Sequence, residues 1–238
     1  INNRLVGEEG TVDPEIRCVR LNALDGTMAE LVSYSAHSTV LNSKTMLLSR
    51  DWPGILVDSL ERQPQTFGMY LAGAVGSMSP NEIGKDDFEE LSNQANGVWN
   101  ALKNGPQFSL QPTSPVRMVT LDLPLADPEP RITPNLALRP WLFNWAFGRS
   151  EPQIKALRIG SILLIGVPCD FSGELIAPLD ELARSNGLQL IVTSFNGGYT
   201  GYVTHDRWYT KNAYETVTMN WYGPHQGSYY QHIIQDII

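Results

Sequence analysis

The sequence predicts an α/β fold, in which a mixed β-sheet is flanked by helices. Two observations support this prediction: short apolar runs alternate with amphipathic stretches along the chain, and two strand–helix–strand units stand out at Ala29–Val75 and Ile162–Ser194. Parallel strands need a crossover connection, and a helix in that connection covers a face of the sheet. We therefore expect a parallel strand pair from each unit, within one domain that spans residues 1–238.

The first part of the chain has clear boundary signals. The expected elements are a strand at Ala29–Ala36, a helix at Asp51–Gln63, a strand at Phe67–Val75 and an amphipathic helix at Lys85–Lys103. Asp51 is suited to an N-cap and Pro53 to a first turn, and Gly105 follows the end of the second helix.

The second part begins with a proline-rich stretch. The expected elements are strands at Val116–Leu123, Ala156–Val167 and Leu188–Ser194, and helices at Gly173–Ser185 and Gly227–Ile238. Between the first two strands, Leu123–Pro140 holds five prolines. Because this density excludes a helix or a central strand, we expect a long surface loop there.

Composition narrows the class of protein. Lys and Arg number 17 against 25 Asp and Glu, and the resulting net charge of -8 argues against a nucleic-acid partner. The longest apolar stretch, Ile159–Val167, is too short to span a bilayer. Charged residues make up 18%, which suits a secreted or periplasmic protein, and the start at Ile1 suggests that the chain begins partway through a gene product.

Two cysteines exclude a disulfide scaffold and a cysteine-based zinc cluster. The sequence leaves open whether Cys18 and Cys169 pair with each other.

Four polar segments follow four expected strands directly. They carry His37, Ser79, Asp170 and Tyr199. Because ligands bind outside the carboxyl ends of strands in α/β sheets, these side chains converge on one rim if the strands are neighbours. Imidazole and carboxylate donors suit Zn²⁺.

Each of the four also has a structural interpretation. His37 suits a buried structural histidine, and Ser79 with the Pro-Asn that follows suits a turn. Asp170 suits a helix N-cap, and Tyr199 suits loop packing.

Several short sequence motifs are spread along the whole chain. They are Asn3-Arg4, Val12–Glu15, His37–Leu41, Gly73–Asn81, Arg158–Gly160 with Gly166–Pro168, Asn196–Thr204 and Tyr222–His225. In these motifs the chain resembles the catalytic domain of the neutral/alkaline (non-lysosomal) ceramidase family. The resemblance implies a zinc-dependent amide hydrolase that acts on an N-acylated sphingoid base, with this chain as the C-terminal portion of the catalytic domain.

The resemblance also implies roles for single residues. His37, Asp170 and Tyr199 match three zinc ligands, and Ser79 matches the serine nucleophile next to the metal. Tyr209 and Tyr214 are candidates for stabilising the tetrahedral oxyanion. The residues do not decide whether Ser79 or zinc-bound water attacks.

The chain departs from the family pattern in two places. The family's first histidine ligand lies in a segment upstream of this chain, so that segment is expected to supply a further histidine. Asp170 stands where the family has a glutamate, one methylene longer, and Glu174 is a reserve candidate for that carboxylate.

The substrate implied is a lipid or another N-acyl small molecule. Trp141–Phe147 holds four aromatic residues that suit an acyl channel, a transient contact with a membrane surface, or the core. The net charge of -8 speaks against attraction to anionic lipid. Two other functions stay open: a hydrolase of a non-sphingolipid amide or ester, and an inactive ceramidase-like binding protein.

Overall fold

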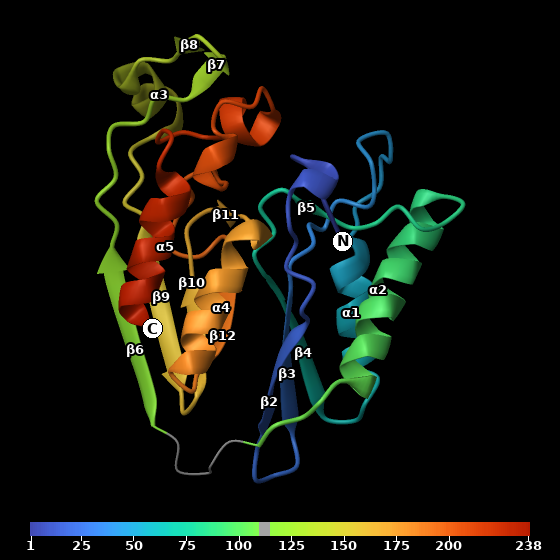
Figure 1. Cartoon of the computed structure of the whole chain (residues 1–238). Helices are drawn as coiled ribbons and strands as arrows, with labels where there is room; N and C mark the ends of the chain where they lie inside the picture. The colour runs from blue at the N-terminus through green and yellow to red at the C-terminus, as the bar shows by residue number, and fades with distance from the viewer. Residues whose placement is uncertain (110–114) are drawn as a thin grey trace.

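The fold is α/β and has two halves that meet at one end of their sheets (Figure 1). It is seen in a computed structural model that describes residues 1–109 and 115–238. The predicted fold class is confirmed, but the main strands form two mixed sheets where the sequence suggested one. The main elements of the first half are β2 (Arg17–Asn22), β3 (Met28–Tyr34), α1 (Asp51–Leu60), β4 (Thr66–Ala72) and α2 (Asp87–Asn104). Those of the second half are β6 (Val116–Asp122), β9 (Gln153–Ile159), β10 (Ile162–Gly166), α4 (Ile176–Ser185), β12 (Gln189–Thr193) and α5 (Gln226–Ile237).

The first sheet has the strand order β2-β3-β4. β2 pairs with β3 antiparallel, and β3 pairs with β4 parallel across the α1 crossover, as the first unit predicts. The buried Trp52 of α1 packs edge-on against Tyr34 and Tyr70, with ring centroids 6.1 and 4.9 Å away. Asp51 is not the N-cap: that position is Arg50, and Asp51 is the first residue of the helix. Its carboxylate accepts hydrogen bonds from the N–H groups of Trp52 (2.9 Å) and Leu41 (3.0 Å).

The second sheet has the order β12-β10-β9-β6 and is parallel only between β10 and β12. The prediction of one strand at Ala156–Val167 is wrong. The chain turns at Gly160, whose φ of 60° lies in the left-handed region, and β9 and β10 form a hairpin there. α4 crosses over between β10 and β12, as the second unit predicts.

The proline-rich stretch is mostly irregular but is not only a loop. β7 (Arg131–Thr133) and β8 (Leu136–Ala137) form a short hairpin in it, followed by α3 (Pro140–Phe147). The hairpin is held against the C-terminal part of the chain, because the Arg131 guanidinium donates to the carbonyl oxygens of Tyr209 (2.8 Å) and Thr216. Tertiary contacts therefore organise a segment that has little local preference for a strand.

The two halves are joined by main-chain contacts at the carboxyl ends of β4 and β12. The Ser194 N–H donates to the Ala72 carbonyl (2.9 Å), and the Gly76 N–H donates to the Phe171 carbonyl (2.8 Å). A Cβ atom at Gly76 would lie 2.3 Å from the carbonyl oxygen of Asp170. Only glycine therefore permits the loop after β4 to approach β11 (Asp170–Phe171) this closely.

Cys18 and Cys169 do not pair. Both are free, Cys18 on the exposed side of β2 and Cys169 in the core of the second half, where burial raises the pKa of its thiol. None of the helices in the described part of the chain is long and apolar enough to cross a membrane.

The close approach of the main chain at Gly76 can be tested by substituting alanine, which adds one methyl group. Gly76→Ala is expected to lower the free energy of unfolding by about 2 kcal/mol or more, because the added Cβ meets main chain that cannot rotate away. Gly97→Ala is the matched control: Gly97 is exposed within α2 with open space at its Cβ, so alanine should stabilise by about 0.5–1 kcal/mol. Urea denaturation of both variants measures the effect, and equal stability of the two would contradict the packing at Gly76.

Candidate functional site

The junction of the two halves gathers residues from four loops. His37 follows β3, Ser79 lies beyond β4, Asp170 follows β10 and Tyr199 follows β12. All four strands have their carboxyl ends at this junction, since β3 pairs parallel with β4, β10 pairs parallel with β12, and β4 meets β12 there. The site thus lies outside the carboxyl ends of the strands, which is where ligands bind in α/β proteins.

Three of the four side chains, joined by a second tyrosine, form one cluster around Asp170. The Nε2 atom of His37 lies 3.2 Å from Oδ1 of Asp170, and the Tyr199 hydroxyl donates to Oδ2 at 2.5 Å. The Tyr202 hydroxyl lies 3.1 Å from the same Nε2 of His37. Asp170 is only 2% exposed, so its carboxylate depends on these partners for solvation.

The backbone on both sides of the cluster is fixed. β11 pairs with β13 (Tyr202–Val203) in parallel, which sets Asp170 opposite Tyr202. The His37 N–H donates to the carbonyl of Met78 (3.1 Å), and the Trp52 indole donates to the carbonyl of His37 (3.0 Å). These contacts fix the backbone at His37 and at Asp170, and so they hold the imidazole beside the carboxylate.

Two loops of the site contain non-glycine residues in the left-handed region. They are Ser77 (φ 64°) and Phe195 (φ 65°). The Phe195 ring lies beside both His37 and Tyr199, with centroids 6.4 and 6.1 Å away. The Ser77 hydroxyl is buried and has no hydrogen-bond partner among the described residues. Strain of this kind is typical of functional sites.

The two phenols of the cluster are held in their protonated form. Burial raises the pKa of Tyr199, and the hydrogen bond to the Asp170 carboxylate and its charge raise it further. Burial and then the charge of Asp170 raise the pKa of Tyr202. Without a cation beside them, both phenols are therefore hydrogen-bond donors at neutral pH.

The other three candidates are placed differently. Ser79 lies in β5 (Met78–Ser79), paired with Asn2 of β1 (Asn2–Asn3), and is next to the residue that accepts from His37. Tyr214 packs edge-on against Tyr202, with ring centroids 5.8 Å apart. Tyr209 instead stacks under the Arg131 guanidinium at 3.9 Å and makes no contact with the cluster in the described part of the chain.

The reserve carboxylate, Glu174, has other partners. Its buried side chain pairs with Arg207 and accepts a hydrogen bond from the Trp208 indole (2.9 Å). A buried carboxylate with two donors is already neutralised. Asp170, and not Glu174, is the carboxylate that faces His37.

Sequence reasoning did not single out Tyr202, although it lies in the quoted Asn196–Thr204 motif. Tyr199 and Tyr202 are three residues apart, and only the pairing of β13 with β11 brings the second phenol to His37. Tyr202 could have been noted as the tyrosine of the strand-like Gly-Tyr-Val-Thr segment. The sequence does not predict which residue of β11 lies opposite it, and so could not place its hydroxyl beside His37.

The donor set of the cluster fits a zinc ion in part. One imidazole, one carboxylate and a phenol meet within hydrogen-bond distance, and a catalytic zinc needs three protein ligands and an open position. In residues 1–109 and 115–238 no group of three His, Cys, Asp and Glu residues forms a metal site, so the third donor from this chain would be a phenol. His205, His225 and His232 contact none of the cluster: His205 caps the turn at Asp206–Trp208, and the other two are exposed.

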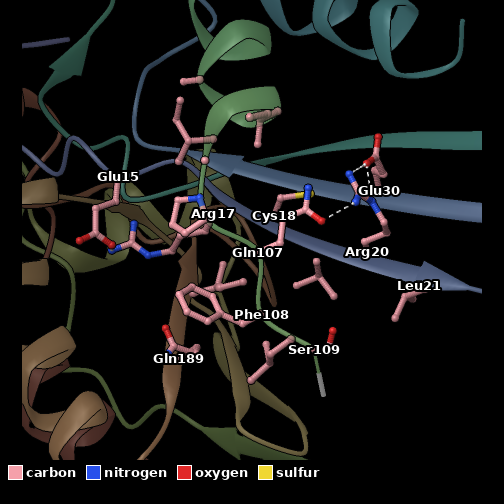
Figure 2. Close-up of a pocket in the computed structure, with 18 of the residues that line it drawn as sticks. Glu15, Arg17, Cys18, Arg20, Leu21, Glu30, Gln107, Phe108, Ser109 and Gln189 are labelled. Carbon is pink, nitrogen blue, oxygen red and sulfur yellow. Dashed lines mark hydrogen bonds and ion pairs between the residues drawn. The ribbon is translucent and has the colours of Figure 1, made fainter. Parts of the chain in front are cut away.

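A separate groove of about 1370 Å³ lies between β2 and β12, away from the junction. Figure 2 shows Arg17, Cys18, Gln107, Phe108 and Gln189 around it. His37, Ser79, Asp170 and Tyr199 do not line it. The groove is therefore a feature distinct from the cluster.

The chain is similar in structure to neutral ceramidase. It matches the crystal structure of neutral ceramidase from Pseudomonas aeruginosa with a TM-score of 0.72 and 16% identity, over 94% of this chain and 46% of that one. It matches a second structure, described as ceramidase complexed with C2, with a TM-score of 0.71 and 14% identity, over 94% of this chain and 47% of that one. No protein-family model and no curated protein sequence matches the chain. The chain spans about half the length of these structures and shares the fold of that part of neutral ceramidase.

Proposed function

We propose that this chain carries part of the active site of a zinc-dependent amide hydrolase of neutral ceramidase type. Its substrate would be ceramide or a related N-acyl lipid, cleaved at the N-acyl linkage. The observation that carries the proposal is the cluster of imidazole, buried carboxylate and two phenols at the carboxyl ends of four strands. The shared fold with neutral ceramidase supports it.

Under this proposal, His37 and Asp170 are zinc ligands through Nε2 and Oδ1. We favour Tyr202 as the phenol ligand, because its oxygen lies beside the same Nε2, while Tyr199 binds the other carboxylate oxygen and orients it. Tyr199 is the alternative ligand that the resemblance implies. A further histidine would come from outside this chain. Bound zinc would polarise the amide carbonyl and lower the pKa of a bound water to about 7.

The chain's own residues would act around that ion. Ser79 is the proposed nucleophile, on the strand segment whose main chain bonds to His37. Tyr214 is proposed to donate a hydrogen bond to the oxyanion, since it lies one ring beyond Tyr202 and is half exposed. For Tyr209 the stacking on Arg131 favours a structural role.

Two variants distinguish the role of His37 in zinc binding from the role of Ser79 as the nucleophile. His37→Ala should lose zinc and activity, because it removes the imidazole that this chain brings to the cluster. Ser79→Ala should keep zinc and lose at least about 100-fold in kcat, the scale of a lost nucleophile. Elemental analysis of protein that includes the upstream segment and is purified without chelators, together with hydrolysis of N-acyl sphingosine, measures both. Unchanged turnover in Ser79→Ala would remove its assigned role.

The two phenols can be ranked by zinc affinity. Tyr202→Phe should weaken zinc binding about tenfold, and more than Tyr199→Phe, because only the Tyr202 oxygen adjoins His37 Nε2. Isothermal titration with zinc compares the two variants with the wild type. A larger loss in Tyr199→Phe would exchange their roles, and no loss in either would exclude a phenol ligand.

Turnover of N-acyl sphingosine against short N-acyl amines and esters tests the substrate class. A ceramidase-type enzyme should prefer the long-chain sphingoid substrate. Preference for the short amides or esters would favour a hydrolase of another substrate, and a protein with neither zinc nor turnover would be an inactive relative.

A further inference from the structure

The α3 helix is apolar around almost its whole circumference. Its sequence is Pro-Trp-Leu-Phe-Asn-Trp-Ala-Phe, and Asn144 is its one polar side chain. Phe143 is 5% exposed and packs on Trp221, with ring centroids 5.1 Å apart. Trp141 and Trp145 lie one turn apart on the opposite face and are 69% and 80% exposed. The core alternative for this aromatic segment therefore holds only for Phe143.

A helix that is hydrophobic all round is normally covered on every side. Within the described residues Trp141 and Trp145 are mostly exposed, and so is Phe147 (71%), although its ring contacts Phe143 with centroids 4.9 Å apart. Eight residues are too few to cross a bilayer, which needs about 20. Tryptophan side chains, however, favour the boundary between lipid and water, where the ring is apolar and its N–H remains hydrated.

The local charge differs from that of the chain. The charged residues nearest the two ends of α3 are Arg139 and Arg149, with Glu151 two residues further on, whereas the whole chain has a net charge of -8. Arg139 and Arg149 are exposed, flank the two ends of α3, and form no ion pair in the described part of the protein. The argument from net charge against anionic lipid therefore does not hold for this segment.

We propose that α3 binds the surface of an anionic lipid bilayer and lies in the plane of the interface. Trp141 and Trp145 insert at the level of the headgroups, and Arg139 and Arg149 pair with lipid phosphates. In Figure 1, α3 lies at the outer end of the second half, next to the β7–β8 hairpin and beyond the strands of the sheet. The two tryptophans of α3 are exposed to solvent.

The lipid contact would lie close to the cluster. Phe143 contacts Trp221, and Trp221 packs edge-on against Tyr199 with ring centroids 5.3 Å apart. One aromatic ring, that of Trp221, thus separates α3 from Tyr199, whose hydroxyl contacts Asp170. A water-insoluble N-acyl lipid would be taken up beside the site, and this step rests on the proposed function, whereas the binding of α3 to lipid does not.

Co-sedimentation of the chain with vesicles tests the proposal. Vesicles of phosphatidylcholine with about one-third phosphatidylglycerol should bind the wild type, and Trp141→Ala/Trp145→Ala should lower the partition coefficient about tenfold, or about 1.4 kcal/mol. Arg139→Gln/Arg149→Gln should weaken binding to these vesicles and leave binding to pure phosphatidylcholine unchanged. Ile83→Ala/Phe88→Ala is the matched control, two exposed apolar residues of the other half, and should bind as the wild type does.

Three results would overturn the proposal: no binding of the wild type to either vesicle, equal binding by the tryptophan variant, or an oligomer in light scattering that this variant dissociates. The last result would make α3 a contact between copies of the chain. Circular dichroism confirms that each variant is folded. Ser79→Ala separates the two proposals, because this variant should bind vesicles fully while losing turnover. If the protein binds vesicles through α3 but has no hydrolase activity, the lipid-binding proposal stands and the proposed hydrolase function is wrong.

Discussion

One buried carboxylate links the two halves of the site. Asp170 comes from the second half, yet one of its oxygens faces His37 from the first half while the other accepts from Tyr199. A carboxylate this far from water is costly unless every oxygen has a partner. The backbone is arranged accordingly: Gly76 permits the loop after β4 to contact the main chain of Asp170, and the pairing of β11 with β13 brings Tyr202 alongside.

Much of this arrangement follows from patterns in the sequence, and the exceptions have physical reasons. The periodicity of α1, α2 and α4 is local, so their positions could be predicted to within a few residues. The hairpin at Gly160 could not, because a single glycine in an apolar run is equally typical of a bulge, and the left-handed turn is visible only in the structure. The short β7–β8 hairpin depends on the Arg131 contacts, which link residues 78 and 85 positions apart.

Some features of the site could also be predicted from the sequence, and others could not. That polar residues after four strands meet at one rim follows from the general geometry of α/β sheets, which is how His37 and Asp170 could be selected. The choice between Tyr199 and Tyr202 depends on the register of β13, and the separation of Tyr209 from Tyr214 depends on Arg131. Four aromatics in seven residues do not indicate which ring is buried; in α3 that is Phe143, and its neighbours form an apolar face close to the cluster.

Anomalous scattering at the zinc absorption edge, from crystals grown with zinc of a protein that includes the upstream segment with the further histidine, tests the central claim most directly. The account predicts a single strong peak bordered by His37 Nε2, Asp170 Oδ1 and a tyrosine oxygen, at about 2.0–2.2 Å from each. A map without a peak in the cluster, or with zinc bound only by residues elsewhere, would contradict the account, whatever the likeness of the fold to ceramidase.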